Sequence, residues 1–183
     1  TKYWNINRKP FEHAAGARFY YPSETHQGAL LKLRYAVESR AAGAAIVGAS
    51  GLGKSLIAGS LLDQIAPEFQ PRVHVVFPQM PVDQLIAFIA TEIAEDIEPP
   101  KTLNESVTQI RKFLSANTIK GCHTILAIDE AHLIEDTDTL QALRLLMNFE
   151  TEGAPQLTLL LIGQPQLLTN LERCPSLGDR VTI

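Results

Sequence analysis

A glycine-rich segment, Gly48–Ser55, has the residue types and spacing that bind phosphate groups. It reads Gly-Ala-Ser-Gly-Leu-Gly-Lys-Ser and fits the pattern G-x-x-x-x-G-K-[ST]. Glycines let the backbone bend so that successive N–H groups converge on phosphate oxygens. Lys54 then reaches the β- and γ-phosphates, and the Ser55 hydroxyl binds Mg²⁺. The predicted nucleotide contacts are Gly48, Ala49, Ser50, Gly51, Leu52, Gly53, Lys54, Ser55 and Leu56.

Two adjacent carboxylates, Asp129 and Glu130, follow the apolar run Thr124–Ile128. In a parallel sheet, the end of such a strand lies at the same edge as the phosphate loop. We predict that Asp129 holds Mg²⁺ through its water shell and that Glu130 accepts a proton from an attacking water. His132 is interpreted as a polar residue at a helix start rather than as a functional group.

Three further polar residues occupy positions where spacing alone leaves the role open. Gln164 follows the apolar run Leu157–Gly163. It either hydrogen-bonds the γ-phosphate or the attacking water, or it is an ordinary turn residue before Pro165. Arg173 and Arg180 lie beyond the last full apolar run. An arginine there either completes the site of a neighbouring subunit, as an arginine finger does, or is a surface residue.

Short apolar runs alternate with helical patterns, which predicts an α/β fold with a central parallel sheet sandwiched by helices. The predicted strands are Ala44–Val47, Val73–Phe77, Thr124–Ile128, Leu157–Ile162 and the start of another at Val181–Ile183. The predicted helices are Ser55–Ile65, Val82–Ile93, Ser106–Ile119, Thr137–Phe149 and Gln166–Leu171. An earlier helix, capped by Ser23 or Thr25, is expected to run to about Arg40 and to be broken by Gly43. Glu95–Lys101 is interpreted as a surface connection.

The composition is that of one soluble globular domain. The chain has 183 residues, of which 45% are hydrophobic and 20% charged. We expect a single domain over residues 1–183, with an aromatic segment and helix over 1–42 and the phosphate-binding core over 43–183. No apolar run reaches the roughly 18 residues that a membrane-spanning helix needs. Two distant cysteines favour a reducing compartment.

The formal charge of −4 is unevenly distributed. Residues 1–40 carry a net charge of +4, and the remaining residues carry −8. This is interpreted as chance distribution over solvated faces. The alternative is a basic edge that contacts an acidic subunit or a nucleic acid. No basic run with interleaved aromatic residues gives nucleic-acid binding direct support.

Taken together, these residues resemble the AAA+ ATPases of the general secretion pathway protein A (ExeA) type and their transposition relatives of the TniB/TnsC kind. The resemblance covers most of the chain. Besides the phosphate loop, its segments are Pro10-Phe11, Phe19–Ser23, His26–Tyr35, Ile128–His132 and Leu161–Leu167. The last of these segments is the most specific to the family.

The resemblance implies roles that spacing alone leaves open. Gln164 takes the place of the family's first sensor, and its strand is expected to flank a central phosphate-loop strand. Family members carry an arginine just before the next strand, which favours Arg180 over Arg173 as the finger, although Asp179 stands where glutamine is common. Residues 20–26 (Tyr20–His26) are implied to line the adenine. We expect the helical lid of such proteins to be absent from this chain.

We therefore expect Mg²⁺-dependent ATP binding and hydrolysis by a homo-oligomer with ATP at its interfaces. Asp129–His132 also spells the motif of DEAH helicases. Such helicases use two domains of this kind, and a second one does not fit in 183 residues, so this interpretation is disfavoured. A kinase is disfavoured by the adjacent Asp-Glu pair, and a scaffold with little turnover is disfavoured by the complete set of Lys54, Asp129 and Glu130.

The process that such an ATPase drives is a separate question. The expected process is assembly of a secretion or pilus-type envelope complex through protein partners. The alternative is a transaction on duplex DNA together with a transposase, and the net acidic chain favours the first. The expected location is the cytoplasm. A further expectation is that the full-length protein is anchored to the inner membrane through a C-terminal region absent from this chain.

Overall fold

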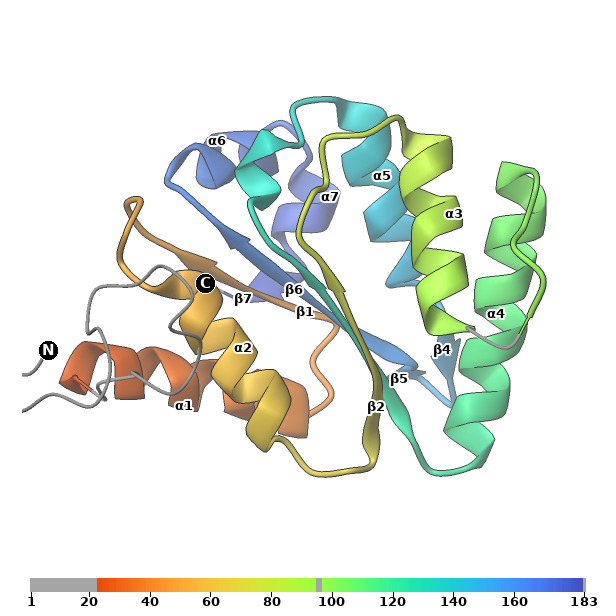
Figure 1. Cartoon of the computed structure of the whole chain (residues 1–183), viewed down its shortest axis with the longest axis horizontal. Coiled ribbons are helices and arrows are strands. Elements are labelled where there is room, and N and C mark those ends of the chain that lie inside the picture. The colour runs from red at the N-terminus through yellow and green to blue at the C-terminus, as the bar shows by residue number, and fades with distance from the viewer. Residues whose placement is uncertain (1–22, 95–96, 183) are drawn as a thin grey trace, which may run out of the picture.

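The computed structural model describes residues 23–94 and 97–182, and its core is a five-stranded parallel sheet (Figure 1). The strands lie in the order β2-β3-β6-β1-β7, which confirms the predicted fold class. They are β1 (Gly43–Val47), β2 (Phe69–Val75), β3 (His123–Ile128), β6 (Leu157–Gly163) and β7 (Val181–Thr182). The predicted aromatic segment before Ser23 lies outside the described residues.

Helices and one small hairpin connect these strands. The helices are α1 (Glu24–Glu38), α2 (Lys54–Gln64), α3 (Val82–Ile93), α4 (Leu103–Ile119), α5 (Thr137–Leu146), α6 (Gln166–Glu172) and α7 (Pro175–Gly178), with a 3-10 turn η3 (Ala131–Leu133). The hairpin pairs β4 (Glu150–Thr151) with β5 (Ala154–Pro155). Among the described helices, none has the length and apolar character needed to cross a membrane.

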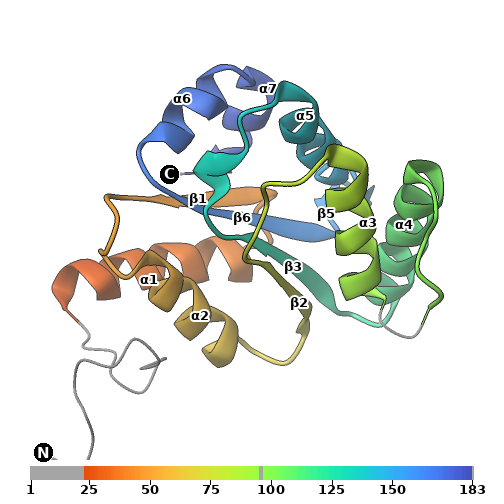
Figure 2. The ribbon, with the colours of Figure 1, turned by 45° about the horizontal axis from the view of Figure 1, so that its top comes forward.

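Both faces of the sheet are covered because successive side chains of each strand point to opposite sides. On one face, α1 and α2 pack against Ala44 and Leu160. On the other face, helices α3 to α7 pack against Ala45 and Leu159. Figures 1 and 2 show this division, with α1 and α2 on the opposite side of the sheet from the other helices. This burial on both sides explains why the strands read as continuous apolar runs.

The first helix begins at one of its two predicted caps and ends earlier than expected. The Ser23 hydroxyl accepts a hydrogen bond from the backbone N–H of His26 at 3.3 Å, so Ser23, not Thr25, is the cap. Helix α1 ends at Glu38, and Arg40 takes a left-handed φ of 52°. The prediction that Gly43 breaks this helix was therefore wrong, since Gly43 is the first residue of β1.

Strand β2 begins at Phe69, four residues before the predicted start, and Arg72 within it contacts the preceding helix. Its guanidinium donates hydrogen bonds to carbonyl oxygens at the end of α2 and beyond, those of Leu62, Ile65, Ala66 and Phe69. These bonds satisfy carbonyl groups that a helix end leaves without intrahelical partners. Arg72 thus fixes the end of α2 against the start of β2.

The register of the sheet brings the carboxyl ends of three strands together. Val47 of β1 pairs with Gly163 of β6, and Ile128 of β3 pairs with Leu161 of β6. The loops that follow β1, β3 and β6 therefore leave the sheet at one edge. Strand β1, which precedes the phosphate loop, is flanked by β6, which precedes Gln164, as the resemblance implies. The resemblance also implies that β1 is the central strand, but the middle strand of the five is β6.

A buried histidine lies at the opposite edge of the sheet. His123 begins β3, is 1% exposed, and lies 2.9 Å through Nε2 from the Thr158 hydroxyl oxygen. Thr158 donates its own hydrogen to the Ala41 carbonyl oxygen at 2.7 Å, so the His123 Nε2–H is the donor of the first bond. Burial, with a smaller contribution from the charge of Arg40, lowers the pKa of His123 to about 4.

This histidine is expected to make the stability depend on pH. Its folded-state pKa lies below the ordinary value of 6.5, so the stabilisation is complete above pH 6.5 and is lost as the pH falls toward 4. Between pH 7 and pH 5, the free energy of unfolding should fall by about 2 kcal/mol more in the wild type than in His123→Gln. Urea unfolding at both pH values measures this difference, and equal losses in the two proteins would contradict it.

Candidate nucleotide-binding site

The loop between β1 and α2 has the backbone conformation that the glycine pattern predicts. Gly51 and Gly53 have φ values of 78° and 73°, in the left-handed region that glycine adopts without strain. Gly53 is the N-cap of α2, and it has no side chain to bond the first N–H groups of that helix. Those N–H groups and the positive end of the helix form a site for an anion.

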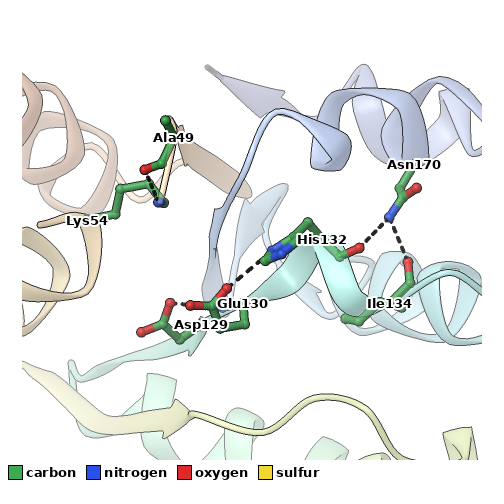
Figure 3. Close-up of polar contacts among 7 residues, drawn as sticks. All are labelled: Ala49, Lys54, Asp129, Glu130, His132, Ile134 and Asn170. Atoms are coloured by element: carbon green, nitrogen blue, oxygen red, sulfur yellow. Dashed lines mark hydrogen bonds and ion pairs between the residues drawn. The ribbon is translucent and has the colours of Figure 1, made fainter. Parts of the chain in front are cut away.

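Lys54 is the first residue of α2, and its ammonium group turns back over the loop. Its Nζ donates a hydrogen bond to the Ala49 carbonyl oxygen at 2.9 Å (Figure 3). Ser55 follows in the first turn of α2 and is exposed. The predicted loop residues thus lie together, with a cation and a hydroxyl group at the helix N-terminus.

His26 of α1 contacts the tip of this loop. Its Nε2 lies 3.1 Å from the Leu52 carbonyl oxygen, and a Cβ atom on Gly53 would lie 3.4 Å from His26 Cε1. Of the predicted adenine-lining segment 20–26, only residues 23–26 belong to the described part of the chain. Within that part, His26 is in contact with the phosphate loop.

The two carboxylates follow β3, and the structure gives them different environments. Asp129 is 5% exposed, and its Oδ1 accepts a hydrogen bond from the Glu130 backbone N–H at 2.8 Å. Its Oδ2 lies 3.8 Å from Nε2 of His74, a residue of β2 that the sequence did not single out. Glu130 has a left-handed φ of 49°, and its side chain is 46% exposed. The chain thus turns sharply between a buried carboxylate and a half-exposed one.

The Glu130 carboxylate is paired with a neighbour on the same turn. Its Oε2 lies 3.4 Å from Nδ1 of His132, the residue interpreted above as a polar helix-start residue. His132 indeed lies in the short turn η3, and its side chain is 11% exposed. Figure 3 shows this pair beside Asp129, with Lys54 of the phosphate loop at the same edge of the sheet.

Main-chain contacts connect the three loops at this edge. The Gly48 N–H donates to the Gly163 carbonyl oxygen at 3.2 Å, which joins the start of the phosphate loop to the end of β6. A Cβ atom on Gly163 would lie 3.2 Å from the His132 backbone nitrogen, so β6 and η3 approach each other closely. Gln164 follows Gly163 directly and is half-buried. The structure therefore brings Gln164 to the edge that carries the phosphate loop and the carboxylates.

The two candidate arginines lie elsewhere. Arg180 precedes β7, whose first residue, Val181, pairs with Gly43 at the amino end of β1. It is exposed, and its guanidinium donates a hydrogen bond to Asn148 Oδ1 at 2.6 Å. Arg173 is the exposed C-cap residue of α6. Arg180 thus lies before the amino end of β7, and the structure does not place it at the candidate site of its own chain.

The donor set fits a nucleotide with a magnesium ion. The loop offers backbone N–H groups and the Lys54 ammonium to phosphate oxygens. Ser55 and Asp129 offer hydroxyl and carboxylate oxygens, which Mg²⁺ prefers as ligands. The half-exposed Glu130 lies on the same turn as Asp129, within reach of solvent. Such a set can bind a nucleoside triphosphate and present its terminal phosphate to water.

The loop, the paired carboxylates and the strand order define the class of P-loop nucleotide-binding proteins. Residues 37–171 match the family described as AAA domain, and the chain belongs to that family of AAA-type ATPase modules. It is 30% identical over 185 residues to general secretion pathway protein A of Aeromonas hydrophila. The match spans all of this chain and 33% of that protein, and the resemblance stated from the sequence is thereby confirmed.

Solved structures share the fold at low sequence identity. Cdc6p of Pyrobaculum aerophilum aligns with a TM-score of 0.70 and 17% identity, over 97% of this chain and 48% of that one. The ORC2 protein of Aeropyrum pernix, in its ADPNP–ADP complexes, aligns with a TM-score of 0.69 and 14% identity, over 95% of this chain and 49% of that one. The chain spans about half the length of these neighbours.

Proposed function

We propose that this chain binds ATP with Mg²⁺ and hydrolyses it to ADP and phosphate. The observation that carries the proposal is the meeting of the Lys54 loop and the Asp129–Glu130 turn at one edge of the sheet. The test is steady-state release of phosphate from ATP in the presence of Mg²⁺. Release no faster than that of a variant without the Glu130 carboxylate would contradict the proposal.

The roles proposed for the residues follow from their chemistry and position. Lys54 and the loop N–H groups bind the phosphates, while Ser55 and Asp129 hold the Mg²⁺ ion, which neutralises charge on the phosphates when bound. Glu130 takes a proton from the attacking water. Gln164 donates a hydrogen bond to the γ-phosphate or to that water. Residues 1–183 are proposed to act as one domain, with the phosphate-binding core over 43–183.

The proposed process is assembly of a secretion or pilus-type envelope complex, in which the ATPase acts on protein partners in the cytoplasm. It is supported by the 30% identity to general secretion pathway protein A. The alternative, action on duplex DNA with a transposase, is supported by the resemblance of the chain to transposition ATPases. Turnover measured with and without duplex DNA separates the two, since a DNA-associated ATPase is expected to respond to DNA.

An arginine finger would place the active site between subunits, and Arg180 is the proposed finger. A guanidinium from a neighbouring subunit stabilises charge on the γ-phosphate, so turnover per subunit should rise with protein concentration. We expect Arg180→Ala to abolish this rise while each subunit still binds ATP. Arg173→Ala is the matched control and should keep the rise.

Mixing two inactive variants tests the same idea independently. In a mixture of Arg180→Ala and Glu130→Gln, one type of interface has both a base and a finger. Part of the activity should therefore return. If turnover does not depend on concentration in a sample that light scattering shows to be monomeric, Arg180 does not act in a neighbouring site.

A further inference from the structure

A buried asparagine on α6 bonds the turn that follows the paired carboxylates. Asn170 is 1% exposed, and its Nδ2 donates hydrogen bonds to the carbonyl oxygens of His132 at 2.9 Å and Ile134 at 3.0 Å (Figure 3). Both amide hydrogens are thus used on η3 and the residue after it. The reverse orientation of the amide would set Oδ1 against both carbonyl oxygens, so these bonds fix the side chain in one orientation.

The helix that carries Asn170 begins two residues after Gln164. Leu167 of α6 packs against Gly163, where an added Cβ would meet its Cδ2 at 3.1 Å, and the Leu167 N–H donates to the Gln164 carbonyl oxygen at 2.9 Å. Helix α6 is therefore bound at one end to the backbone of Gln164 and, through Asn170, to η3. These contacts join the segment that carries Gln164 to the turn that carries Glu130.

The position of Glu130 depends on this turn. Its backbone is left-handed, and its Oε2 lies 3.4 Å from His132 Nδ1. The carbonyl group of His132 is one of the two that Asn170 holds. A shift of η3 would move His132 and the Glu130 carboxylate together. Misplacement of a catalytic group by about 1 Å can cost on the order of a hundredfold in rate.

We infer that Asn170 is a positioning residue for ATP hydrolysis, which holds the Glu130–His132 turn at a fixed place relative to Gln164. The inference rests on the proposed function, since it assigns to Glu130 the role of the base. Asn170 is buried and both of its amide hydrogens are bonded to the turn, so its loss should affect the chemical step and leave nucleotide binding intact.

The experiment compares two buried asparagines that each donate two hydrogen bonds through Nδ2. Asn117 also donates two hydrogen bonds through Nδ2, to the Gln70 carbonyl oxygen at 2.7 Å and to the Thr124 hydroxyl oxygen at 3.1 Å. Thr124 lies at the amino end of β3, away from the nucleotide edge. Asn170→Leu and Asn117→Leu remove the same groups, and both should lower the midpoint of thermal unfolding.

Single-turnover hydrolysis of bound ATP, at a temperature where both variants are folded, separates the two positions. We expect Asn170→Leu to slow hydrolysis about ten- to hundredfold with an unchanged Kd for ATP, and Asn117→Leu to stay within about twofold of the wild type. Asn170→Gln, which keeps the amide donors, should recover part of the rate. Equal rates in the two leucine variants, or a loss confined to Kd, would overturn the inference.

A double variant distinguishes failure of this inference from failure of the proposed function. With Glu130→Gln in place, Asn170→Leu should slow the residual hydrolysis no further, because the group that it positions is already gone. An additive loss would overturn the positioning role. Full activity of Glu130→Gln alone would overturn the proposed base, whereas a slow Glu130→Gln beside a fast Asn170→Leu would overturn only the role of Asn170.

Discussion

Replacing Glu130 by glutamine is expected to slow ATP hydrolysis about a hundredfold while leaving ATP binding intact. Glutamine keeps the size of the side chain beside His132, but it cannot accept the proton of the attacking water. The buried Asp129 remains in place to hold Mg²⁺, so the affinity for the nucleotide should not change. Steady-state phosphate release measures the rate, and calorimetry measures the affinity.

The matched control for this variant is Glu135→Gln. Glu135 is an exposed carboxylate just beyond η3, so the substitution removes the same charge from the same region. It should leave the rate within about twofold of the wild type. Full activity of Glu130→Gln, or an equal loss in the two variants, would show that Glu130 is not the base.

Lys54→Ala is expected to weaken ATP binding about ten- to hundredfold. Hydrogen bonds to charged groups contribute about 1.5–3 kcal/mol, and the alanine variant loses such a contact to the phosphates. In the structure, Lys54 Nζ bonds the Ala49 carbonyl oxygen at the surface of the loop, so the fold should not depend on it. Calorimetric titration with ATP and Mg²⁺ measures the affinity.

Thermal unfolding provides an independent measurement of the same loss. Without nucleotide, Lys54→Ala should unfold at nearly the wild-type temperature, but the rise that ATP causes in the wild type should shrink with the lost affinity. Lys32→Ala, at an exposed position of α1, removes the same charge away from the loop and should behave as the wild type does. An unchanged affinity in Lys54→Ala would refute the assignment of the phosphate loop.

Local patterns were sufficient to predict where the glycine-rich loop and the carboxylate turn lie in the fold. The glycines before Lys54 lie within six residues of one another, the acidic pair directly follows Ile128, and each group comes after a short apolar strand. The order of strands and helices follows from the same alternation. Helix α3 begins and ends at the predicted residues because Pro81 precedes it and its apolar spacing is regular.

Contacts between distant residues could not be predicted in this way. His26 meets the carbonyl group of Leu52, and Asn170 meets that of Ile134, through folds of the chain that no local spacing encodes. Both bonds join a side chain to the main chain of another element. Because every residue has a backbone carbonyl group, the residue type of the acceptor does not reveal such a bond. The capping of α2 by Arg72 escaped prediction for the same reason.

The order of the strands in the sheet governs when the site can form as the chain is synthesised. Strands β1 and β2 follow each other along the chain, but β3 and β6 lie between them in the sheet. Gly43 pairs with Leu159, so β1 cannot pair with β6 until the ribosome has made more than a hundred further residues. Pairing over such distances is slow and leaves apolar strands uncovered in the meantime. An emerging chain that stops before β6 therefore has the complete phosphate loop but no strand beside β1 to hold it, and it should depend on chaperones until β6 is made.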